Sequence, residues 1–202
     1  MSDAIANWQW LIPLARRDEA VVLSTPQTAA ASHITEGFAR TRYFDPTSDG
    51  MDLALFTAAW TAEFAEGSLD CIAAPDVDRY LRGWPPAVEM LSVVRRSLRR
   101  GSGCYVVAEA IRIGNRTTRF AGLAPSRHEQ YLRRAGFRPR ARYYIVNTPA
   151  LPLHLLPIDR MALIAWERAT EDDGIWSFLR RLLIRVGLHA LLFRYRLIIV
   201  TA

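Results

Sequence analysis

The sequence predicts one α/β domain over residues 1–202, in which a mostly parallel sheet carries helices on both faces. Short apolar runs rich in β-branched residues alternate along the chain with longer amphipathic segments, as in strand–helix–strand units. The 202 residues, 50% hydrophobic and 23% charged, suffice for one buried core, and no Gly- or Ser-rich linker divides them. These observations favour a single globular fold.

Strands and helices alternate through the first half of the chain. Runs such as EAVVLS and CYVVA are apolar without alternation, which is typical of strands buried on both faces of a sheet. Between them Val88, Leu91 and Val94 recur at helical spacing, with polar residues on the opposite side. We predict strands at 19–24, 40–44, 69–74 and 104–108, and helices at 28–38, 51–56 and 85–100.

The second half begins with a polar stretch, expected to be a loop, and ends with a strand. Ser126 and Glu129 match a capping box, so a helix is expected to begin there and to end before Gly136. Three prolines between residues 149 and 157 predict an irregular segment, because proline lacks a backbone N–H. Helices are further predicted at 158–168 and 175–192, and strands at 143–147 and 197–201.

Composition excludes several classes of function. The net charge is +6 and every basic residue other than histidine is arginine, yet no basic run interleaves with aromatics as in RNA-binding sheets, so nucleic-acid binding is not predicted. Cys71 and Cys104 lie in apolar runs, which indicates buried, reduced thiols. The four histidines lack metal-ligand spacing, and no metal is expected. With neither an export signal nor a spanning segment in evidence, a cytoplasmic location is expected.

Five short motifs follow one another between residues 8 and 147. They are WLIPL with VVLS, FDP at 44–46, GSLDCI at 67–72, the helix 90–100 with GSG and the strand to Glu109, and RAGF at 134–137. Their order and spacing resemble class I S-adenosylmethionine-dependent methyltransferases. The resemblance implies a Rossmann-like methyltransferase sheet, with further helices and an antiparallel last strand in residues 158–202.

The resemblance also implies S-adenosylmethionine as cofactor, held at the carboxyl ends of the strands. Asp45 matches the family's acid after the second strand, which accepts hydrogen bonds from both ribose hydroxyls; a turn aspartate satisfied by its own loop is the alternative. Ser24, Thr25 and Gln27 stand where the family has its glycine-rich turn, and their side chains are candidate cofactor contacts. Asp76 follows the fourth strand, where family members keep substrate or catalytic groups, or it caps a helix.

Two departures from the family pattern predict impaired cofactor binding. The turn after the first strand has no glycine between Leu23 and Glu36, and Pro26 removes one N–H that could donate to a ligand. The acid expected after the third strand is not evident around residues 60–62. The first hypothesis is therefore a non-catalytic subunit or binding module, and the second an active, divergent methyltransferase on a small-molecule or protein acceptor.

A third hypothesis rests on the predicted helix 175–192, which is basic and amphipathic. It could pack on the sheet with its arginines in water. Alternatively, Arg180, Arg181 and Arg185 could contact an anionic membrane surface or a protein partner, as basic amphipathic helices do. The second interpretation predicts a peripheral membrane or complex-assembly protein.

Overall fold

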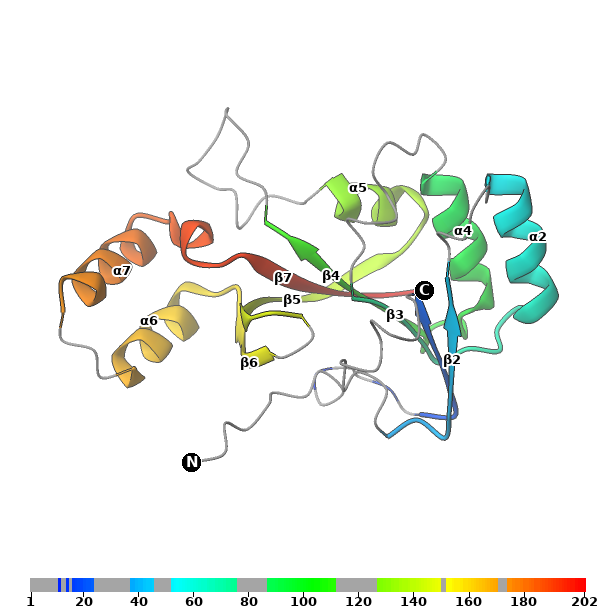
Figure 1. Cartoon of the computed structure of the whole chain (residues 1–202), viewed down its shortest axis with the longest axis horizontal. Coiled ribbons are helices and arrows are strands. Elements are labelled where there is room, and N and C mark those ends of the chain that lie inside the picture. The colour runs from blue at the N-terminus through cyan, green and yellow to red at the C-terminus, as the bar shows by residue number, and fades with distance from the viewer. Residues whose placement is uncertain are drawn as a thin grey trace.

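The computed structural model describes residues 16–23, 37–45, 52–75, 87–111, 127–149, 152–170 and 174–202, together with Leu11 and Leu14. Within these residues the chain forms a seven-stranded sheet in the order β2-β1-β3-β4-β7-β5-β6 (Figure 1). The strands are β1 (Glu19–Leu23), β2 (Arg40–Phe44), β3 (Cys71–Ala74), β4 (Cys104–Ala110), β5 (Arg138–Asn147), β6 (Pro152–Pro157) and β7 (Tyr195–Thr201). The helices are α2 (Leu53–Glu63), α4 (Ala87–Ser97), α5 (Arg127–Arg134), α6 (Arg160–Ala169) and α7 (Ile175–Arg185), followed by a 3₁₀ turn, η4 (His189–Leu192).

The sheet is mixed, with a parallel half and an antiparallel half. Strands β2, β1, β3 and β4 run parallel, so their carboxyl ends meet at one edge. Strand β7 enters antiparallel between β4 and β5, and β5 pairs antiparallel with β6. The α/β prediction and the antiparallel last strand are thereby confirmed.

The largest core lies between the sheet and helices α2, α4 and α5. Apolar residues at helical spacing, Phe56 and Trp60 in α2 and Leu91 and Val94 in α4, face the sheet and are fully buried. On the opposite face of the sheet Cys71 and Cys104 are register neighbours on β3 and β4. Both are free and buried, as predicted, and burial raises the pKa of each thiol, that of Cys104 to about 11. These thiols are core residues with little thiolate character.

The proline-containing segment is regular, contrary to the sequence prediction. Residues Pro152 and Pro157 are the first and last residues of β6, which pairs with β5 and is the last strand in the order of the described sheet. An edge strand tolerates proline, because one side of its backbone makes no ladder hydrogen bonds. Two of the three prolines, Pro152 and Pro157, therefore mark the limits of an edge strand.

Two helices end well away from the residues where they were predicted to end. Helix α2 extends to Glu63, because Phe56, Trp60 and the following Phe64 keep contact with the core. Helix α7 ends at Arg185 instead of continuing to residue 192, and Gly187 follows with a positive φ of 80°. A residue in this conformation ends a helix, and the chain continues as a 3₁₀ turn. Of the predicted helix 28–38, residues 28–36 lie outside the described residues, and Gly37 and Phe38 are not helical.

Candidate functional site

Asp45 lies at the carboxyl edge of the parallel half of the sheet. Leu23 and Phe44, the last residues of β1 and β2, are register neighbours, and Asp45 follows Phe44 directly. The half-buried Asp45 is therefore placed beside the end of β1, where the family resemblance requires the ribose-binding acid. The other candidate contacts, Ser24, Thr25, Gln27 and Asp76, lie outside the described residues.

An aromatic cluster beneath Asp45 fixes the end of β2. The Phe44 ring contacts Trp60 and Phe56 edge-on, with ring centroids 5.1 and 5.6 Å apart. Trp60 Nε1 donates to Ser97 Oγ on α4 at 3.1 Å, which satisfies the one polar atom of this buried indole. Residues 60–62, where an acid after a third strand was sought, thus belong to α2, and Trp60 is a core residue.

A buried polar cluster that sequence reasoning missed lies where β4, β7 and β5 adjoin. Glu109 near the end of β4 forms an ion pair with Arg196, its register neighbour on β7. On the next strand Tyr144 Oη lies 2.7 Å from His189 Nδ1, and the Tyr144 ring stacks on Phe193. The signal was present in the sequence, since Glu109 directly follows, and Arg196 directly precedes, an apolar run predicted to be a strand.

Burial keeps the tyrosine and histidine of this cluster uncharged near neutral pH. It raises the pKa of Tyr144 to about 12, against an opposing effect of the Arg196 charge. It also lowers the pKa of His189. The Glu109 carboxylate and the Arg196 guanidinium neutralise one another, so the cluster combines a buried ion pair with the neutral Tyr144–His189 hydrogen bond. Among the described residues no group of three His, Cys, Asp or Glu side chains could hold a metal ion.

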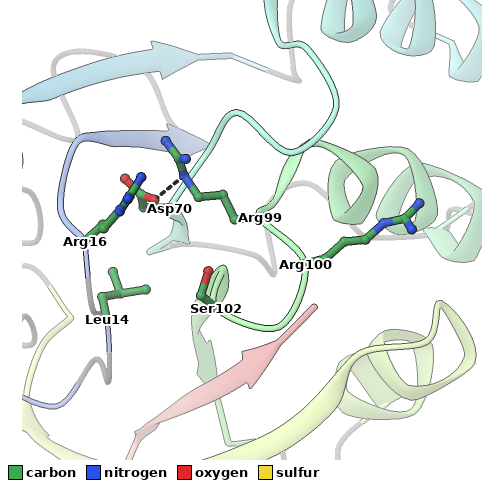
Figure 2. Close-up of a pocket in the computed structure, with 6 residues that line it drawn as sticks. All are labelled: Leu14, Arg16, Asp70, Arg99, Arg100 and Ser102. Atoms are coloured by element: carbon green, nitrogen blue, oxygen red, sulfur yellow. Dashed lines mark ion pairs between the residues drawn. The ribbon is translucent and has the colours of Figure 1, made fainter.

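A pocket of about 290 Å³ lies at the opposite, amino edge of the sheet (Figure 2). Asp70, which precedes β3, accepts hydrogen bonds on Oδ2 from the backbone N–H groups of Asp18 and Glu19, at 2.8 and 3.0 Å. Its Oδ1 lies 2.6 Å from Nε of Arg99. This carboxylate therefore joins the start of β1 to the turn before β4. The pocket is lined by Leu14, Arg16, Asp70, Arg99, Arg100 and Ser102.

Helix α7 does not pack on the sheet with its apolar side. It lies against α6, and Ile175, Trp176 and Phe178 are 80, 69 and 68% exposed. Of the arginines predicted to make contacts, Arg181 forms an ion pair with the buried Glu167 of α6, whereas Arg185 is exposed and Arg180 half-buried. The arginines thus face solvent at least in part, but the prediction that the apolar residues pack on the sheet is wrong. None of the described helices is long and apolar enough to cross a membrane.

Comparisons with known proteins find similar solved structures but no similar curated sequence. No protein-family model matches the sequence. A search of curated proteins finds no match either. The structure is similar to an S-adenosylmethionine-dependent methyltransferase from Archaeoglobus fulgidus, with a TM-score of 0.51 and 14% identity over 96% of this chain and 91% of that chain. A cyclopropane synthase from Mycobacterium tuberculosis aligns with a TM-score of 0.50 and 10% identity, covering 95% of this chain and 80% of that one. Together with the order of strands and the motifs along them, these similarities show that the chain has the fold of the class I S-adenosylmethionine-dependent methyltransferases.

Proposed function

We propose that the protein is a methyltransferase-fold module with impaired cofactor binding, which acts as a non-catalytic subunit or binding module. The observation that carries the proposal is the connection between β2 and β3. Its residues 53–63 form helix α2, and Trp60 of that helix is buried in the core. Residues 60–62, where the family pattern has an acid after its third strand, thereby bring no acid to the carboxyl edge.

The first turn supports the same proposal. The segment after Leu23 has no glycine before Gly37, and glycine is the residue that allows a backbone to approach a ligand closely. Pro26 in this segment also lacks an N–H donor. Asp45 alone among the described candidates fits the cofactor, through its carboxylate at the end of β2. The residues therefore fit S-adenosylmethionine in part, and we derive no reaction step from it.

Calorimetric titration of the folded protein with S-adenosylmethionine and its demethylated product tests this proposal. We expect no saturable heat at millimolar ligand from the wild-type chain. Saturable binding that Asp45→Ala weakens would contradict the proposal. Glu66→Ala is the matched control, because Glu66 is also an accessible carboxylate but lies near the amino edge of the sheet.

An active, divergent methyltransferase is the second candidate, and the position of Asp45 favours it. A carboxylate beside the end of β1 has the acceptor atoms that two ribose hydroxyls need. In that case the cofactor would supply the methyl group, and Ser24, Thr25 and Gln27 would replace the glycine-turn contacts with side-chain ones. Methyl transfer that is lost in Asp45→Ala and retained in Glu66→Ala would identify this candidate as correct.

A further inference from the structure

Helix α7 presents its apolar side to solvent. Ile175, Leu179, Leu182 and Val186 recur at spacings of four, three and four residues and are all exposed. This spacing places them on one side of the helix. Trp176 and Phe178, also exposed, widen this stripe to either side of Ile175. We call these residues the α7 face: Ile175, Trp176, Phe178, Leu179, Leu182 and Val186.

The opposite side of α7 is held by polar contacts, which fix the orientation of the helix. Glu167 of α6 is 2% exposed and accepts a hydrogen bond from Ser177 Oγ at 2.5 Å. Arg181 Nε lies 2.8 Å from both carboxylate oxygens of Glu167. Ile184, fully buried, packs on the same side in the core around Tyr144. Turning the α7 face inward would therefore expose Ile184 and bury Arg181 away from its carboxylate.

Arginines border the α7 face along both sides. At about 100° per residue, Arg185 and Arg181 lie beyond Phe178, and Arg180 lies beyond Trp176 on the other side. Helix α7 itself contains no acidic residue. The helix stands with α6 at the end of the molecule away from α2 and α4 (Figure 1). An apolar stripe with aromatic residues and a cationic border is the pattern of helices that lie in a membrane interface.

We propose that the α7 face docks on the surface of an anionic lipid membrane. The apolar side chains enter the region between headgroups and acyl chains, and Arg185 and Arg180 stay at the level of the lipid phosphates, while Arg181 keeps its ion pair with Glu167. A second copy of the chain is the competing occupant. The cationic border of α7 disfavours it, since two such faces in contact would bring arginines beside arginines.

Co-sedimentation of the full chain with vesicles tests the proposal without any cofactor, so its outcome is independent of the methyltransferase question. We expect the protein to sediment with vesicles of phosphatidylcholine and phosphatidylglycerol, more weakly with phosphatidylcholine alone, and more weakly at high salt. The double variant Trp176→Ser/Phe178→Ser should weaken binding at least about tenfold, because both side chains are exposed in the free protein and buried in the lipid. Leu55→Ser is the matched control, since Leu55 is 57% exposed on α2, outside the α7 face.

Charge variants test the cationic border separately. Arg185→Gln should weaken binding to anionic vesicles about fivefold, whereas Arg134→Gln, at an exposed position on α5, should leave it unchanged. Glu171, Asp172 and Asp173 precede α7 in the sequence, and replacing them by their amides should strengthen binding to anionic vesicles. Arg181 is kept intact, because its loss would leave Glu167 buried without a counter-ion.

Two results would overturn the proposal. One is wild-type protein that stays in the supernatant with anionic vesicles. The other is a Trp176→Ser/Phe178→Ser variant that binds anionic vesicles as strongly as the Leu55→Ser control does. If the free wild-type protein is instead a dimer in sedimentation velocity and Trp176→Ser/Phe178→Ser is a monomer, the α7 face belongs to a second copy of the chain.

Discussion

Substitutions of Asp70 test how much its buried carboxylate contributes to the stability of the parallel half of the sheet. Its carboxylate is 2% exposed and serves three groups, the N–H of Asp18, the N–H of Glu19 and the Arg99 guanidinium. The change Asp70→Ala removes all of these contacts. Asp70→Asn retains one oxygen that can accept from the two N–H groups but removes the charge that faces Arg99. Arg99→Gln removes the ion pair and leaves the backbone contacts.

The magnitudes follow from what each change leaves unsatisfied. A buried N–H that loses its acceptor costs about 1–3 kcal/mol. Asp70→Ala leaves two partly buried N–H groups without this acceptor. The Arg99 side chain is 31% exposed, so water replaces its lost partner and the ion pair contributes at most about 1 kcal/mol. We expect losses in the free energy of unfolding of about 4 kcal/mol for Asp70→Ala and about 1 kcal/mol each for Asp70→Asn and Arg99→Gln.

Urea denaturation followed by far-UV circular dichroism measures these losses, and thermal unfolding provides a second measure. For a chain of this size about 4 kcal/mol corresponds to a drop in Tm of roughly 8–16 °C. Equal losses for Asp70→Ala and Asp70→Asn would refute the reasoning, because the charge and not the backbone contacts would then carry the effect. A loss below about 1 kcal/mol in Asp70→Ala would refute it as well.

Two further predictions concern the core. A Cβ at Gly103 would lie 2.8 Å from the backbone N of Arg99, so Gly103→Ala should lower the free energy of unfolding by about 3 kcal/mol. Gly101→Ala should lower it by only about 1 kcal/mol, because a Cβ there meets open space and is opposed only by the positive φ. Equal losses for the two variants in urea denaturation would contradict this prediction. Burial, assisted by the Arg196 charge, lowers the pKa of His128 from its ordinary 6.5 to about 3. The unfolded chain therefore takes up this proton first as the pH falls, and the stability that His128 contributes is complete above pH 6.5 and declines toward pH 3. In His128→Phe the free energy of unfolding should depend less steeply on pH over this range, and an unchanged slope would show that other groups cause the dependence.

Local patterns in the sequence were sufficient to predict most of the strands and helices that the structure describes, although not β6. Continuous apolar runs became β1, β3, β4 and β7, and the helical spacing of Val88, Leu91 and Val94 became α4. Such strands and helices are determined by residues that are close together in the sequence, so their periodicity can be recognised from the sequence alone. The position of Asp45 at the carboxyl edge was also predictable, because an acid directly after a parallel strand must lie at that edge.

Other features depend on partners that are distant in the sequence. The prolines at 152 and 157 are compatible with a strand only because β6 lies at the sheet edge, beyond β5. The pairing of Glu109 with Arg196 crosses 87 positions of the chain and required β7 to enter beside β4.

The orientation of α7 also depends on residues outside the helix itself. The sequence by itself determined that this helix has an apolar side and three arginines. Only the tertiary structure decided which side faces inward, because Glu167 on α6 binds Ser177 and Arg181 and so holds the polar side of α7 against the protein. A periodic pattern describes a helix relative to its own axis, whereas the direction of burial is decided by the surfaces that pack against it.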